Sequence, residues 1–130
     1  MANTERTGGC LCGAVRFRLK GQPLRVGLCH CQDCRRVSGS AFNFFAVWPR
    51  TSFEGTGDLK SFAGRSFCPK CGSRVASLRD DEAEIMLGSL DEAPANVIPQ
   101  YELWIGRREG WMHVLPWADQ FEGDRAPASE

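Results

Sequence analysis

Hydrophobic and polar residues alternate along several short segments of the chain. In residues 11–20, the apolar side chains of Val15, Phe17 and Leu19 are separated by basic residues. Because successive side chains of a β-strand point to opposite faces of a sheet, this period of two predicts a half-buried strand. Gly21 and Pro23 follow the pattern, so we expect the strand to end there.

The other candidate strands are short, rich in β-branched or aromatic residues, and bounded by glycine or proline. They cover residues 42–48, 58–62, 65–68, 74–78, 84–87 and 101–105. In the last of them, Glu102 and Trp104 are expected to lie on the face opposite to the apolar residues. Residues 93–97 have room for no more than a helical turn, because Pro94 and Pro99 keep it short. Many short strands with almost no helical periodicity predict an all-β fold.

The length and charge of the chain narrow the class of protein. Its 130 residues suit a single domain, with an ordered core over about residues 8–121 and a polar tail after Phe121 that we expect to fray. Sixteen basic and sixteen acidic side chains cancel, whereas nucleic-acid binding draws on a surplus of positive charge. We therefore expect no nucleic acid among the partners.

The first nine residues are polar and do not form the apolar segment of a secretory signal. No apolar run approaches the roughly 20 residues needed to cross a bilayer. We therefore expect a cytoplasmic protein that does not bind a membrane. In a reducing compartment, cysteines serve as metal ligands or catalytic thiols more often than as disulfides. The odd number of cysteines, seven, points the same way.

The seven cysteines fall into three groups. Cys10 and Cys12 form a C-x-C motif, Cys29, Cys31 and Cys34 form C-x-C-x2-C, and Cys68 and Cys71 form C-x2-C followed by Gly72. Zinc in proteins is normally held by four ligands in a tetrahedron. The C-x2-C spacing lets one tight turn direct two thiolates at one ion, and Gly72 gives the backbone room to turn back.

Seven thiols divide naturally into four and three. Cys10, Cys12, Cys68 and Cys71 would close a structural zinc site that ties two distant segments together, a direct gain in folding free energy for a small domain. The alternative pairs Cys68 and Cys71 with Cys31 and Cys34.

The remaining trio, Cys29, Cys31 and Cys34, would leave one position of its zinc open for water or substrate, as catalytic sites do. The alternative is a second closed site completed by His30, His113 or a carboxylate. His30 lies directly between two ligands and is better suited to support the site from outside, or to pack within the loop.

Charge favours a thiol as the exogenous ligand of the trio. A zinc ion with three thiolates carries a net charge of about −1 and is a weaker Lewis acid than a zinc held by imidazoles. Binding a fourth thiolate lowers the pKa of that thiol and presents its sulfur as a nucleophile. Arg35 and Arg36 directly follow Cys34 and could offset this negative charge or bind a substrate carboxylate; the alternative is a solvent-exposed pair.

The segments GGCLCGAVRF, CHCQDCRRVSGSAF and FCPKCGS resemble the glutathione-dependent formaldehyde-activating enzyme family, which includes centromere protein V. The likeness runs from about Gly8 to Phe121. It implies a β-tent of short antiparallel sheets with two zinc ions per chain. It also implies that Cys10, Cys12, Cys68 and Cys71 hold the structural zinc, and that Cys29, Cys31 and Cys34 hold the catalytic one. The activity it implies is the joining of glutathione and formaldehyde to give S-hydroxymethylglutathione, and the reverse.

The segment YELWIGRREGW departs from the family pattern. Many members carry a histidine where we align Glu102. If this side chain lines the substrate pocket, an anionic group has replaced a neutral or cationic one, and a different substrate is expected.

The sequence thus predicts a zinc-dependent carbon–sulfur lyase or synthase that acts on a small-molecule thiol and a small aldehyde. Water, Glu102 or His30 would supply the proton for the product. Two alternatives stay open: a non-catalytic binding module with two structural zinc ions, and a thiol carrier or sensor that binds glutathione without turning it over.

Overall fold

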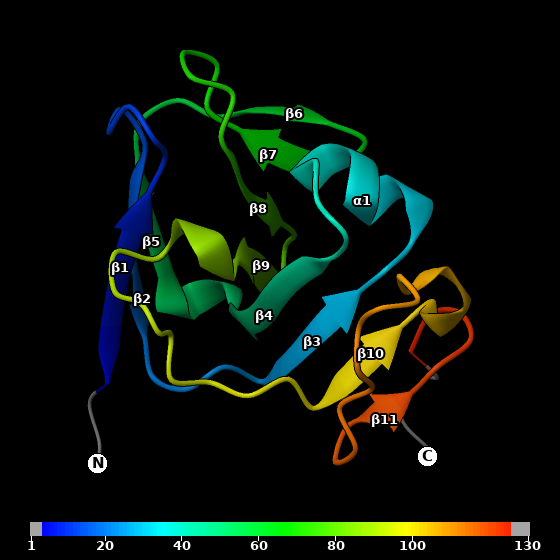
Figure 1. Ribbon diagram of the computed structural model, residues 1–130. Helices are drawn as coiled ribbons and strands as arrows, with labels where there is room; N and C mark the ends of the chain where they lie inside the picture. Colours follow the sequence, from blue (N-terminus) through cyan, green and yellow to red (C-terminus); the bar gives the residue numbers. More distant parts are fainter. Residues whose placement is uncertain (1–3, 126–130) are drawn as a thin grey trace.

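Eleven short strands form two sheets in the computed structural model, which describes residues 4–125 (Figure 1). The smaller sheet has the order β1 (Glu5–Gly9), β2 (Arg16–Lys20) and β5 (Phe53–Thr56). The larger sheet has the order β11 (Asp119–Gln120), β10 (Tyr101–Leu103), β3 (Arg25–Cys29), β4 (Asn43–Pro49), β9 (Glu82–Met86), β8 (Arg74–Leu78), β7 (Arg65–Phe67) and β6 (Lys60–Phe62). The predicted all-β class is confirmed.

The alternation that predicted the first strand is realised in β2. Phe17 and Leu19 are buried, while the basic residues between them are exposed. The strand begins at Arg16 rather than at residue 11, because residues 10–15 form the turn that carries the C-x-C motif. The unpredicted strand β1 pairs antiparallel with β2 along its whole length. Its sequence, ERTGG, has no apolar alternation by which it could be recognised.

Strand β4 lies at the centre of the larger sheet, between β3 and β9. Its apolar sequence was predicted as a strand, and both of its faces are covered, as expected for a central strand with a continuous apolar run. Ala46 and Trp48 face the core between the two sheets. Phe45 and Val47 face a second cluster, which contains Cys29 and Tyr101. The site described below therefore rests on a rigid strand.

The irregular elements differ from the predictions. The structure contains a seven-residue helix, α1 (Gln32–Ser38), that no periodicity indicated, because none of its residues is buried. Single-turn 3₁₀ helices follow β4, β9 and β10: η1 (Arg50–Ser52), η2 (Leu87–Ser89) and η3 (Ile105–Arg107). The helical turn considered for residues 93–97 was wrong, since this segment consists of bends and irregular chain.

Strand β10 corrects the prediction for residues 101–105. It pairs in parallel with β3 on one side and β11 on the other, and it ends at Leu103. Tyr101 and Glu102 are both buried, so Glu102 does not lie on an exposed face. Trp104 leaves the strand with a φ of 56°, in the left-handed region, where the chain turns into η3.

The two sheets stand at an angle to each other in Figure 1, and apolar side chains fill the space between them. The three-stranded sheet stands at the left of this view, and α1 with the β10–β11 end of the larger sheet lies at the right. We predicted that the chain frays after Phe121. Part of that segment, residues 126–130, lies outside the described residues. Within residues 4–125, no helix is long and apolar enough to cross a membrane.

Candidate metal centres

Two tight turns carry the four thiols of the first cluster. The turn between β1 and β2 holds Cys10 and Cys12 and closes with a hydrogen bond of 3.2 Å from the Gly13 N–H to the Cys10 carbonyl. The turn after β7 holds Cys68 and Cys71 and closes with one of 2.8 Å from the Gly72 N–H to the Cys68 carbonyl. Gly72 has a φ of 82°, the conformation for which glycine was expected here.

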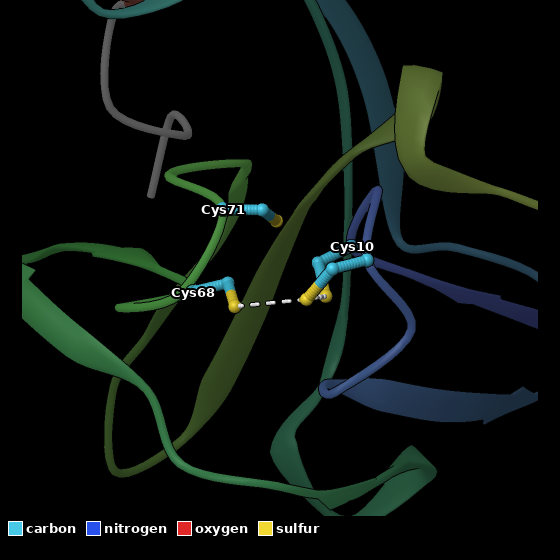
Figure 2. A group of neighbouring side chains, drawn as sticks. Cys10, Cys68 and Cys71 are labelled. Carbon is cyan, nitrogen blue, oxygen red and sulfur yellow. Dashed lines mark hydrogen bonds between the residues drawn. The ribbon is translucent and has the colours of Figure 1, made fainter.

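The four sulfur atoms lie within 4.8 Å of one another. The Sγ of Cys12 is 3.7 Å from that of Cys10 and 3.8 Å from that of Cys68. A tetrahedral ion with Zn–S bonds of about 2.3 Å requires S···S distances of about 3.8 Å. Figure 2 shows the labelled side chains of Cys10, Cys68 and Cys71 pointing toward one another. The cluster therefore has the dimensions of a closed four-thiolate metal site.

Ser73 joins the two halves of this cluster. Its hydroxyl accepts a hydrogen bond of 2.9 Å from the Leu11 N–H and lies 3.2 Å from the Cys71 sulfur. The side chain and backbone of Ser73, with the backbone of Cys12, lower the pKa of Cys71 to about 5. The Val15 N–H also donates to the Cys10 sulfur, at 3.2 Å. These donors favour the thiolates that a metal needs.

The second cluster lies where β3 gives way to α1. Cys29 is the last residue of β3, Cys31 is the N-cap of α1, and Cys34 stands in its first turn. The Cys31 sulfur accepts a hydrogen bond of 3.3 Å from the Cys34 N–H. The three sulfur atoms lie within 4.8 Å of one another. We call this cluster the trio.

The thiols of the trio share negative charge unequally. A hydrogen bond from Cys29 lowers the pKa of Cys34 to about 7 against the opposing effect of burial, and Cys31 and Asn43 contribute to the shift. The same contact with Cys34, together with burial, raises the pKa of Cys29 well above its usual range. Three thiolates at this spacing repel one another unless a cation lies among them. The trio therefore fits a soft divalent metal ion.

The trio offers three metal-binding side chains among residues 4–125, since neither a histidine nor a carboxylate joins it there. His30 is fully buried, and its Nε2 lies 2.8 Å from Glu102 on β10. His113 is exposed and belongs to neither cluster. The structure thus brings the cysteines together in the four-and-three arrangement, and Cys68 and Cys71 do not lie with Cys31 and Cys34.

Glu102 is the centre of a buried network. Its Oε1 accepts from His30, and its Oε2 accepts from the Leu115 N–H at 3.1 Å and from the Gln120 side chain at 3.0 Å. Burial by itself raises the pKa of Glu102, but these hydrogen bonds and the charge of Arg108 outweigh it and lower the pKa to about 2. The ionised Glu102 therefore connects the trio loop, by which we mean residues 29–34, to the C-terminal segment that contains Leu115 and Gln120.

Arg35 and Arg36 were considered as cations that offset the charge of the trio or bind a substrate carboxylate. The Arg35 guanidinium donates to Glu109 at 2.5 Å and to the Arg107 carbonyl at 3.3 Å. This side chain therefore holds α1 to the segment after β10 and is not available to a substrate. Arg36 is exposed on α1.

Sequence reasoning missed three polar residues near the clusters: Ser73, Asn43 and Arg74. Asn43 begins β4 and is buried beside Cys34. A buried polar residue at the head of the apolar run NFFAVW was a detectable signal, because such a side chain needs a specific partner. Nothing in the local pattern marked Ser73, whose partner Leu11 lies in a distant turn, or Arg74, which donates to Ser77 of its own strand.

The fold and the two thiol clusters define an all-β protein with two candidate metal centres. Its family is shown by a match over residues 5–107 to the glutathione-dependent formaldehyde-activating enzymes. The chain belongs to this family.

One curated protein and one solved structure are similar to this chain. An uncharacterized lyase of Schizosaccharomyces pombe is 34% identical over 76 residues, which cover 55% of this chain and 56% of that protein. The chain thus matches little more than half the length of this curated relative. A crystal structure of a Rhodobacter sphaeroides protein has a TM-score of 0.54 and 21% identity, and the match covers 72% of this chain and 97% of that one. The second likeness concerns the fold alone.

Proposed function

We propose that this protein is a zinc enzyme of the lyase type that forms and breaks a carbon–sulfur bond between a thiol such as glutathione and a small aldehyde such as formaldehyde. Membership of the family supports the reaction class. The observation that carries the proposal is the trio, whose three sulfur atoms converge without a fourth protein ligand in the described part of the chain. Four thiols elsewhere would hold a second, structural zinc.

Zinc held by Cys29, Cys31 and Cys34 would offer one open coordination position that keeps the sulfur of the substrate ionised near neutral pH. In the reaction, the sulfur lone pair attacks the aldehyde carbon and a C–S bond forms. The C=O π electrons move to oxygen, which takes up one proton. The sum is RSH + HCHO → RSCH₂OH, and the reverse reaction breaks the same bond.

The residues around the trio limit which group can supply that proton. Glu102 is held as a carboxylate by its hydrogen bonds, so near neutral pH it has no proton to donate. His30 is fully buried with its Nε2 turned to Glu102, so it fixes the loop between Cys29 and Cys31. Water is therefore the proposed proton source.

The exchange of ¹³C-formaldehyde between its free and glutathione-bound forms, followed by NMR, tests the proposal. We expect the wild-type protein with two zinc ions per chain to accelerate the exchange beyond the buffer rate. The Cys31→Ser variant should fold, bind less than two zinc ions and leave the exchange at the buffer rate. Unaccelerated exchange in a wild-type protein carrying both ions would contradict the enzyme; tight glutathione binding in that protein would then point to a carrier. Two full zinc ions in Cys31→Ser would contradict the assignment of the trio.

A further inference from the structure

A cavity of about 860 Å³ lies between the two thiol clusters. The turn that carries Cys10 and the one that carries Cys71 form part of its wall, and α1 and the start of β4 form another part. Sites for small-molecule ligands typically measure about 300–1,000 Å³, so this volume can hold a thiol of peptide size.

The cavity reaches the surroundings of the trio. Val37 and Ser38 line it from α1, the helix that also carries Cys34. Asn43 lines it as well, pairs with Cys29 in the register of β3 and β4, and forms a side-chain hydrogen bond with Cys34. Helix α1 and Asn43 thus belong both to the wall of the cavity and to the surroundings of the trio.

Three charged residues line this cavity, and two of them neutralise each other. Arg16 donates through both terminal nitrogens to Asp91, at 3.0 Å for the longer contact. Asp91 also accepts from the Thr7 hydroxyl at 2.7 Å. The remaining charge belongs to Arg74, the first residue of β8.

The Arg74 guanidinium is incompletely paired. Its Nη2 donates to the Ser77 hydroxyl at 3.0 Å, whereas its Nε and Nη1 are buried and have no hydrogen-bond partner among residues 4–125. Glu84 is a near anion but forms its own ion pair with Arg79, at 3.5 Å. Buried guanidinium groups normally have all their donors satisfied, so these two N–H groups leave Arg74 able to bind a further acceptor.

The charge of Arg74 also acts on the trio. Burial lowers the pKa of Arg74 below its usual value, while the negative charges of Glu84 and Cys34 oppose this shift. The guanidinium is therefore close enough to the Cys34 sulfur for their charges to interact.

We propose that this cavity binds a thiol that carries a carboxylate, and that Arg74 recognises the carboxylate while the thiol reaches the trio. The inference rests on the proposed function, which supplies the thiol. A guanidinium presents parallel N–H donors that match the two oxygens of a carboxylate, whereas a neutral thiol would leave these donors unused. Arg74 must turn its donors toward the cavity, at the cost of its hydrogen bond to Ser77.

Two thiols with different charges on their carboxyl groups test this assignment: glutathione, and glutathione with both carboxylates converted to methyl esters. The exchange assay would be run with the wild-type protein, with Arg74→Met, and with Arg18→Met as a control at an exposed arginine of β2. Arg74→Met should raise the KM for glutathione about 10- to 100-fold, the usual loss for a hydrogen bond to a charged group. The KM for the diester and the kcat for both thiols should stay unchanged, and Arg18→Met should match the wild type.

An equal rise in KM for both thiols would overturn the proposal, because Arg74 would then act on the trio or on the fold. An unchanged KM for glutathione would overturn it as well. If the wild-type protein accelerates exchange with neither thiol, the proposed function fails, and calorimetric titration still decides on the cavity. Binding of glutathione that is about 10-fold or more weaker in Arg74→Met would then support the carboxylate site; equal binding, or none to the wild type, would refute it.

Discussion

Removing the thiols of the two clusters in matched pairs should separate a structural site from a catalytic one. The first variant, Cys68→Ala with Cys71→Ala, removes the half of the four-thiol cluster that follows β7. The second, Cys31→Ala with Cys34→Ala, removes two thiols of the trio. Each variant loses two sulfur atoms, and we expect each to lose one of two zinc ions.

The lengths of the loops closed by the two ions set the expected difference. An ion shared by Cys12 and Cys68 closes a loop of 56 residues. A cross-link of that length removes chain entropy worth about 4 kcal/mol from the unfolded state. For a chain of 130 residues the unfolding entropy is about 0.27 kcal/mol/K, so this loss lowers Tm by about 15 °C. The trio spans only six residues at the junction of β3 and α1, for which the same relation gives about 2 kcal/mol. Its loss should therefore lower Tm by about 8 °C, half as much.

Calorimetry and metal analysis of the two variants, with the exchange assay, measure these effects. We expect the first variant to lose most of the stability and the second to lose the activity while it stays folded. Equal losses of Tm in both variants would refute the reasoning. So would a first variant that has lost one ion but melts within about 3 °C of the wild type, because the loop would then contribute nothing to stability.

Three further changes have defined outcomes. A chelator should first remove the zinc ion of the trio, while the far-ultraviolet circular dichroism stays native. It should remove the second ion only as the protein unfolds, because four thiolates hold an ion more firmly than three. Simultaneous release of both ions would contradict this order. Glu102→Gln should lower the free energy of unfolding by about 2–4 kcal/mol in urea titrations, because the amide NH₂ that replaces Oε1 cannot accept from His30 and Arg108 as the carboxylate does, and an unchanged midpoint would contradict the network. Gly27→Ala should lower it by about 1–3 kcal/mol, because its Cβ would lie 2.8 Å from the Tyr101 ring, whereas Gly110→Ala meets no neighbour, requires no left-handed backbone and serves as a control for packing.

The sequence predicted those parts of the fold whose signal lies within a few neighbouring residues. Strand β4 and the buried face of β2 followed from apolar patterns of the correct period. Helix α1 was missed because its seven residues bury nothing and its N-cap is Cys31, a residue that capping rules do not include. The parallel pairing of β10 with β3 joins segments about 75 residues apart, and no local pattern carries that information.

The candidate site shows the same division. Spacing favoured a division of the thiols into four and three, because C-x-C and C-x2-C turns direct their sulfur atoms locally, but it left another pairing open. The resemblance to the family implied the grouping that the structure shows. The sequence did not predict which polar residues surround the thiols. Ser73 bridges the two turns only after β1 and β7 have been brought together. Arg35 looked like the cation of the site because it follows Cys34 in sequence, yet its partner, Glu109, comes from a segment that only the tertiary structure places beside it.

The negative charge of Glu102 is stabilised by neighbouring residues of the protein and does not face a substrate. Its position suggested an anion facing the substrate in place of a histidine, but its two oxygens are occupied by His30, Leu115 and Gln120, and the residue is fully buried. Its charge is balanced within the network by the nearby Arg108. The substitution therefore concerns how the trio loop is anchored, and the preference for a substrate must come from a group that the cavity exposes to it. Arg74 lines the cavity and has two donors without a partner among residues 4–125, so we expect the preference of this protein for its thiol to depend on position 74 more than on position 102.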